Sequence, residues 1–212
     1  MRLGLFGGTF NPIHFGHLRA AEEVADFLQL QRLLFIPAAR PPHKNRKSVT
    51  SFTARLEMIR LAVTKHPLFE VSDIENQRPE TSYSIETLRI FRQELGPAIE
   101  IYFIVGLDAM LEIETWMDYQ EIFKLCHFVV LDRPGYDFQA LANILENKMN
   151  CSYQTENQVF IHPGGNKIYF RPITRLDVSS TQIRRLTAMG LSLRFLLPDE
   201  VRRYILENKL YV

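Results

Sequence analysis

The chain has 212 residues, of which 46% are hydrophobic and 23% charged, as is typical of a soluble globular domain. Its formal net charge of +1 gives no overall field to attract nucleic acid or an anionic membrane, so any anion must be bound by local geometry. The two cysteines, Cys126 and Cys151, lack a metal-binding spacing, which favours a reducing compartment over structural zinc. The first residues resemble a strand rather than a secretory signal, and no apolar run approaches the roughly 18 residues needed to cross a bilayer. We therefore expect a cytoplasmic enzyme that binds neither nucleic acid nor membrane.

Short apolar runs alternate with longer segments of helical periodicity along the chain. The runs predict strands at residues 3–6, 33–37, 69–73, 99–106, 127–135 and 168–173. The periodic segments predict helices at residues 18–30, 53–66, 85–96, 137–148, 179–190 and 198–208. A polar segment, residues 150–167, fits neither pattern. The alternation predicts an α/β fold with a doubly wound, Rossmann-like parallel sheet. We expect one domain, residues 1–212, with a small helical portion at about 179–212.

The loop after the first predicted strand holds the most unusual residues, "GGTFNPIHFGH" at 7–17. In a doubly wound sheet, ligands bind beyond the carboxyl ends of the strands, where this loop lies. Gly7 and Gly8 permit close backbone approach to a ligand, and Pro12 fixes a bend before the helix, whose first N–H groups can bind an anion. His14 and His17 are three residues apart, which places both imidazoles on one side of the first turn. Zinc is the weaker interpretation, because no third ligand lies nearby.

The pattern GxFxPxHxGH resembles the signature of the nucleotidyltransferase superfamily, whose members transfer AMP or CMP from a nucleoside triphosphate. Further motifs follow in order: "PPHK" (41–44), "SYSIETL" (82–88), "VGLDA" (105–109), Trp116, "RPG" (133–135), "VSSTQIR" (178–184) and the ending "LLPDEVRRYILENKLY". Together they resemble the bacterial nicotinate mononucleotide adenylyltransferases over almost the whole chain. The resemblance implies a nucleotidyltransferase fold and the transfer of AMP from ATP to nicotinate mononucleotide, which yields nicotinate adenine dinucleotide and pyrophosphate.

The resemblance also assigns residues to ATP. Taken alone, Ser179 is an ordinary helix cap, Lys44 an ordinary surface lysine, and Asp108 either a helix N-cap or an acceptor for ribose hydroxyls. The family instead implies a catalytic set of His14, His17, Lys44 and Arg184. It implies that ATP is bound by Gly7, Gly8, Thr9, Phe10, His17, Gly106, Asp108, Ser179, Ser180, Thr181 and Arg184. Mg²⁺ would be bound mainly through ATP oxygens, with no metal site on the protein, because the sequence shows no cage of carboxylates.

Four residues are implied for nicotinate mononucleotide. Trp116 is the sole tryptophan, and a lone aromatic is more typical of a core, but the family pattern stacks it on the pyridine ring. Tyr83 and Ser84 fall in the loop that holds the nicotinate carboxylate; many relatives have threonine in place of Ser84. Arg133 would contact the phosphate of the mononucleotide.

Two alternatives remain at this point. One is an adenylyltransferase that prefers nicotinamide mononucleotide, since a single amide separates the two substrates. The other is a nucleotide-sensing module without turnover, against which the histidines, Lys44 and Arg184 weigh. The sequence leaves the oligomeric state open.

Overall fold

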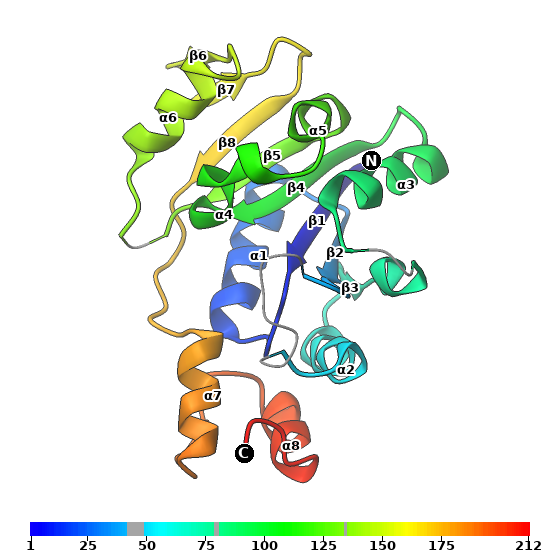
Figure 1. The fold of residues 1–212 in the computed structure, drawn as a ribbon, viewed down its shortest axis with the longest axis vertical. Coiled ribbons are helices and arrows are strands. Elements are labelled where there is room, and N and C mark those ends of the chain that lie inside the picture. Colours follow the sequence, from blue (N-terminus) through cyan, green and yellow to red (C-terminus); the bar gives the residue numbers. More distant parts are fainter. Residues whose placement is uncertain (42–48, 79–80, 134) are drawn as a thin grey trace.

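The computed structural model describes residues 1–41, 49–78, 81–133 and 135–212. Its strands form one eight-stranded sheet in the order β3-β2-β1-β4-β5-β8-β7-β6 (Figure 1). The parallel strands are β1 (Arg2–Gly8), β2 (Arg32–Pro37), β3 (Phe69–Val71), β4 (Glu100–Gly106), β5 (His127–Leu131) and β8 (Lys167–Arg171). At one edge, β7 (Val159–Ile161) and β6 (Ser152–Gln154) are antiparallel. The predicted α/β, Rossmann-like fold is confirmed.

Helices cover both faces of the sheet (Figure 1). One face is packed by α1 (Phe15–Leu28), α2 (Phe52–Val63), α7 (Ser180–Ala188) and α8 (Asp199–Glu207). The other face is packed by α3 (Ser84–Leu95), α4 (Leu107–Leu111), α5 (Tyr119–Leu125) and α6 (Phe138–Asn147). Two short 3₁₀ turns, η2 (Ile74–Gln77) and η3 (Ile113–Thr115), complete the described elements.

Successive side chains of each central strand enter opposite cores. In β2, Leu34 and Ile36 belong to the core beneath α3, whereas Leu33 and Phe35 belong to the core beneath α1. Because strand side chains alternate with a period of two, a strand covered on both faces needs a continuous apolar run. This requirement explains why the buried strands were visible in the sequence.

The polar segment 150–167 supplies the antiparallel edge. It folds into the hairpin of β6 and β7, with residues 155–158 as the turn and Gln158 in the left-handed region at φ 50°. Strands of three residues are too short to show an alternating pattern, and the turn lacks an Asn-Gly pair, so no strand can be predicted here from the sequence. The parallel sheet predicted from sequence is therefore extended by two antiparallel strands.

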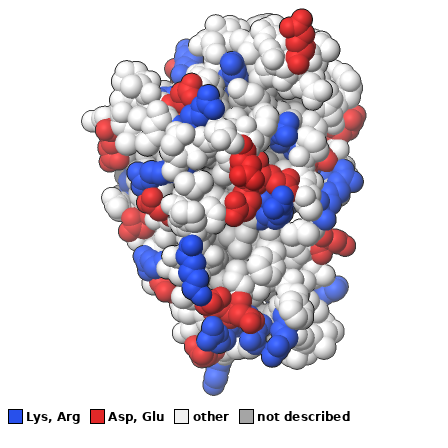
Figure 2. All heavy atoms as spheres, turned by 180° about the vertical axis from the view of Figure 1, so that it is seen from behind, with Lys and Arg blue, Asp and Glu red and all other residues white. Residues whose placement is uncertain are grey.

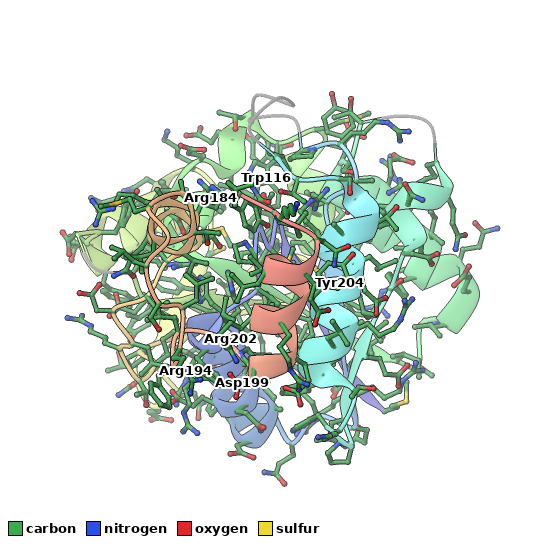
Figure 3. The ribbon with its side chains drawn as sticks, turned by 90° about the horizontal axis from the view of Figure 1, so that it is seen from below. Trp116, Arg184, Arg194, Asp199, Arg202 and Tyr204 are labelled. Carbon is green, nitrogen blue, oxygen red and sulfur yellow. The ribbon has the colours of Figure 1, made fainter. Side chains whose placement is uncertain are left out.

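The C-terminal helices pack against the N-terminal half of the chain. Helix α8 lies against α2, with Tyr204 between them (Figure 3). An ion pair between Arg202 Nε and Asp199 Oδ1, 2.9 Å long, closes the first turn of α8. The division into one domain with a helical C-terminal portion stays a prediction.

The surface shows mixed charge. On the face opposite to that of Figure 1, lysine and arginine side chains are interspersed with aspartate and glutamate (Figure 2). Within the described ranges, no helix combines the length and apolarity needed to cross a bilayer.

Candidate active site

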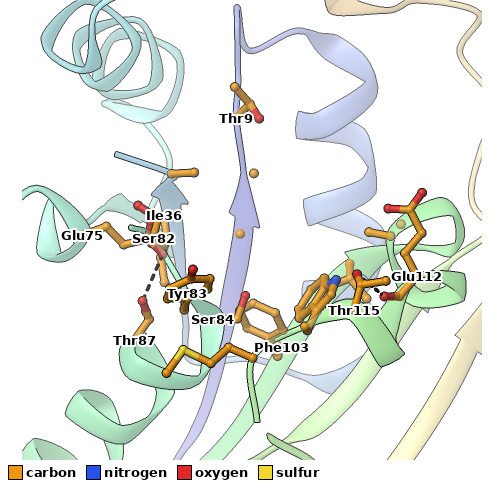
Figure 4. A pocket seen from close by; sticks show the side chains of 18 residues that line it. Thr9, Ile36, Glu75, Ser82, Tyr83, Ser84, Thr87, Phe103, Glu112 and Thr115 are labelled. Atoms are coloured by element: carbon orange, nitrogen blue, oxygen red, sulfur yellow. Dashed lines mark hydrogen bonds between the residues drawn. The ribbon is translucent and has the colours of Figure 1, made fainter. Parts of the chain in front are cut away.

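A cavity of about 390 Å³ opens at the carboxyl ends of β1 and β4 (Figure 4). This volume is in the range of small-molecule sites. Residues predicted from sequence that line it are Gly7, Gly8, Thr9, Tyr83, Ser84, Gly106 and Trp116. Further lining residues include Ile36, Glu75, Ser82, Thr87, Phe103, Glu112, Thr115 and Met117. The topology thus brings together three loops that are far apart in sequence, as expected for the carboxyl edge of a parallel sheet.

Trp116 forms part of the cavity wall. It follows η3 and is half-buried, and its indole meets the Phe103 ring edge to face, with centroids 6.4 Å apart. A Cβ atom on Gly7 would lie 3.2 Å from Phe103 Cζ, so the glycine leaves room for this ring. Phe103 therefore packs against the Trp116 indole, which still lines the cavity. Trp116 thus packs against the hydrophobic core and also lines the cavity, and its stacking on a pyridine ring stays a prediction.

A buried polar network supports the loop before α3. The Glu75 carboxylate accepts a hydrogen bond of 3.0 Å from Thr87 Oγ1 (Figure 4). Arg78 Nη2 donates to the same hydroxyl oxygen at 2.9 Å. Ser82 Oγ accepts from the Arg40 backbone N–H at 2.9 Å, which ties this loop to the end of β2. Sequence reasoning missed these residues. The available signal was Thr87, a polar residue on the buried face of an otherwise apolar helix stripe.

The two histidines of the first loop lie side by side. His14 is the N-cap residue of α1 and His17 belongs to the first turn; their rings stack with centroids 3.8 Å apart. Phe10 meets the His17 ring edge to face at 5.0 Å. The spacing of three residues thus has the predicted geometric effect, which is to place both imidazoles on one side of the helix start.

His14 is neutral at pH 7. Burial of the ring and, to a smaller extent, the nearby positive charge of Arg133 together lower its pKa to about 4. A neutral imidazole donates through one ring nitrogen only. His14 can therefore supply a single N–H to a ligand, without a full positive charge.

Helix α7 is hydrogen-bonded to the loop after β1. Ser180 Oγ donates to the Pro12 carbonyl at 2.8 Å, and Arg184 Nη1 donates to the Asn11 carbonyl at 2.8 Å. Ser179 caps the helix, since its Oγ accepts from the Gln182 N–H at 3.1 Å. The cap interpretation is therefore correct for the Ser179 hydroxyl. The start of α7 is thereby held next to the 9–12 loop, and the first backbone N–H groups of a helix can bind an anion.

Comparison with known proteins identifies the family. Residues 5–186 match the family model described as cytidylyltransferase-like. Over 220 aligned residues, the chain is 46% identical to a protein of Geotalea daltonii named "probable nicotinate-nucleotide adenylyltransferase", and the match covers 100% of this chain and 98% of that protein. The chain belongs to the nicotinate-nucleotide adenylyltransferase family. A second relative, from Geobacter sulfurreducens and with the same name, is 44% identical over 214 residues, covering 100% of this chain and 98% of the relative.

A solved structure shows the same fold. The nicotinic acid mononucleotide adenylyltransferase of Plasmodium falciparum, complexed with NaAD, aligns with a TM-score of 0.75 at 18% identity. The alignment covers 99% of this chain and 97% of that one. The resemblance derived from the sequence motifs is thereby confirmed at the level of both family and fold.

Three further residues that the family resemblance assigns to ATP or to catalysis are Phe10, Asp108 and Lys44. The Phe10 side chain is buried against Phe6 and Phe35, so only its backbone can contact a ligand. Asp108 lies in the first turn of α4 and is half-exposed; because the N-cap residue is Gly106, the N-cap interpretation of Asp108 is wrong. Lys44 lies outside the described residues.

Arg133, which the resemblance assigns to the mononucleotide phosphate, lies beside Asp108, which the resemblance assigns to ATP. Its Nε lies 3.7 Å from Asp108 Oδ1, and its charge acts on His14. Gly106 makes this arrangement possible, because a Cβ there would lie 2.3 Å from Asp108 Oδ1. A contact between Arg133 and the mononucleotide phosphate stays a prediction.

Proposed function

We propose that this protein transfers AMP from ATP to nicotinate mononucleotide, giving nicotinate adenine dinucleotide and pyrophosphate. One observation carries the proposal: the loop whose Gly7, Gly8 and Thr9 line the cavity beside Trp116 runs on to the stacked His14 and His17 at the start of α1. An aromatic site and an anion site joined by one short loop are what a reaction between a pyridine mononucleotide and a triphosphate requires. The names of the full-length relatives support the same activity.

We assign the cavity to nicotinate mononucleotide. The pyridine ring stacks on Trp116, and the backbone of the loop at Tyr83 and Ser84 receives the carboxylate. We assign to ATP the region next to this cavity, which shares Gly7, Gly8, Thr9 and Gly106 with it. Its phosphates lie between the first loop and the start of α7, held by Gly7, Gly8, Thr9, Phe10, Ser179, Ser180, Thr181 and Arg184, and its ribose contacts Gly106 and Asp108.

The reaction is a direct displacement at phosphorus. A 5′-phosphate oxygen of nicotinate mononucleotide bonds to the α-phosphorus of ATP, and the bond from that phosphorus to the bridging oxygen breaks, so that pyrophosphate leaves with the electron pair. Catalysis of this kind depends on positioning and on neutralising charge. His17 and neutral His14 donate N–H groups to the α-phosphate, while Arg184 and Lys44 neutralise charge on the phosphates.

Mg²⁺ is proposed to bind through ATP oxygens. Mg²⁺ is usually bound through substrate phosphates with only one or two carboxylates. Among the described residues, no group of three or more His, Cys, Asp or Glu side chains could hold a metal ion. When bound, it supplies positive charge to the leaving pyrophosphate. We place the reaction in the cytoplasm, supported by Cys126 and Cys151, which are both free thiols.

The test is release of pyrophosphate by the purified protein with ATP and Mg²⁺. We expect release with nicotinate mononucleotide, a lower rate with nicotinamide mononucleotide, and loss of activity with EDTA. The His17→Ala variant should lose about 10²–10³ in turnover, the effect of removing one donor to a transition-state oxyanion. The control His66→Ala changes a histidine beside Phe69, outside the cavity, and should retain activity. Absence of release with nicotinate mononucleotide would overturn the proposal.

A further inference from the structure

The oxygens of the 9–12 loop (Thr9, Phe10, Asn11 and Pro12) accept hydrogen bonds from distant parts of the chain. The Thr9 carbonyl accepts from Arg55, the Asn11 carbonyl from Arg184, and the Pro12 carbonyl from Ser180. Asn11 Oδ1 accepts from two further donors. Asn11 is only 4% exposed, and a buried oxygen left without a donor is costly. The conformation of the loop therefore depends on partners outside the ATP site as well as within it.

Arg55 is one such partner from outside the site. It lies on α2 and is 1% exposed, yet its described hydrogen bonds go to carbonyl groups rather than to a carboxylate. Its Nη1 donates to the Thr9 carbonyl and its Nε to the Thr50 carbonyl, both at 2.9 Å. Removing a charged group from water is costly, so a buried arginine needs hydrogen bonds that compensate for the lost solvent. Here the planar guanidinium holds two backbone segments at a fixed separation.

Tyr211 is the second partner from outside. It follows α8, and its hydroxyl donates to Asn11 Oδ1 at 2.9 Å, across 200 positions of sequence. The Thr50 N–H donates to the same oxygen at 3.2 Å. Burial raises the pKa of the Tyr211 phenol to about 12, so the hydroxyl keeps its proton at physiological pH and remains a donor.

We propose that Arg55 and Tyr211 are positioning residues for the adenylyl transfer. Their hydrogen bonds to Thr9 and Asn11 fix the 9–12 loop, so that its backbone and the adjoining His14 stay aligned with the ATP phosphates. Neither residue lines the cavity, and neither is placed in contact with substrate. The inference rests on the proposed function for its kinetic readout. It extends the functional set to α2 and to the segment after α8.

The Tyr211→Phe variant tests the proposal, because it removes one oxygen atom and keeps the ring. We expect kcat to fall and the KM for ATP to rise, giving a loss in kcat/KM for ATP of about three- to tenfold, as for the loss of one buried hydrogen bond. The affinity for nicotinate mononucleotide should be unchanged. Trp116, the sole tryptophan, reports that affinity directly through its fluorescence.

Tyr204→Phe is the matched control. Tyr204 is also half-buried in the C-terminal portion and packs in the same core as Tyr211, but within the described part of the chain its hydroxyl makes no hydrogen bond. It should have wild-type kinetics. In the second test variant, Arg55→Lys, one ammonium group cannot span the Thr9 and Thr50 carbonyls, and we expect a loss of about tenfold or more.

Equal kcat/KM for ATP in Tyr211→Phe, Tyr204→Phe and the wild type would overturn the proposal. So would an equal loss of ATP and mononucleotide affinity, which would indicate general damage to the fold. If Arg55→Lys fails to fold, the tyrosine pair still decides. If the wild type releases no pyrophosphate, the proposed function fails, while ATP affinities measured by calorimetry on the same variants still test the positioning role.

Discussion

Replacing His14 should change how stability depends on pH. The folded protein keeps this imidazole neutral, with a pKa lowered from 6.5 to about 4 by burial first and by the charge of Arg133 second. In the unfolded chain the ring takes up a proton near its ordinary pKa. The stabilising effect is therefore complete above pH 6.5 and is lost as the pH falls from 6.5 toward 4.

The size of the effect follows from the shift. One pKa unit corresponds to about 1.4 kcal/mol, so the full difference is about 3 kcal/mol, and about 2 kcal/mol of it is lost by pH 5. A His14→Gln variant has no such proton to bind. As the pH falls from 7 to 5, the wild type should therefore lose about 2 kcal/mol more of its free energy of unfolding than the variant does.

Urea unfolding at the two pH values, followed by Trp116 fluorescence, measures this difference. Ile13→Val is the control: the neighbouring side chain is fully buried and has no titratable group, so its cost should be the same at both pH values. Other groups titrate alike in both proteins and cancel. If the His14→Gln difference changed by less than about 0.5 kcal/mol between pH 7 and pH 5, the assignment of a neutral, desolvated His14 would be refuted.

Two further substitutions address the substrate sites. Trp116→Ala should raise the KM for nicotinate mononucleotide about tenfold, because one stacking contact is lost, and should leave the KM for ATP unchanged; equal changes for both substrates in steady-state assays would contradict the assignment. Gly106→Ala would bring a Cβ within 2.3 Å of Asp108 Oδ1 and 3.0 Å of Arg133 Nε, so Asp108 must move. We expect a higher KM for ATP with little change in melting temperature, and an unchanged KM would argue against Asp108 as the ribose acceptor.

The sequence predicted the parallel core of the sheet well, because strands buried on both faces must be apolar throughout. The strand at Glu100–Gly106 matches the predicted 99–106 almost residue for residue. Helix boundaries were harder. Helix α1 begins at Phe15 rather than 18, and its N-cap His14 makes no side-chain cap bond. The helix ends at Leu28, and its C-cap residue in the left-handed region is Gln29 rather than a glycine. Neither end carries the usual signal.

The candidate site divides in the same way. Residues next to a turn or a strand end, such as Gly7 and His17, carry a local motif and could be named in advance, whereas Trp116 was indicated only by the resemblance to the family. Arg55 and Tyr211 could not be predicted. Their contacts with the 9–12 loop join positions 46 and 200 residues apart, and nothing local marks a buried arginine or a tyrosine as the donor to a remote carbonyl or amide oxygen. Only the folded arrangement shows which distant group satisfies which oxygen.

The attachment of the 9–12 loop also bears on the order in which this protein acquires activity. The loop is synthesised early, but its oxygens find their donors only after α2, α7 and the segment reaching Tyr211 have packed. Contacts of such long sequence separation form late, because the entropy of closing the intervening chain must be overcome first. A nascent chain that has exposed only its N-terminal half therefore carries the histidine motif without a competent site. Nucleotide binding by this protein would then mark the completion of folding.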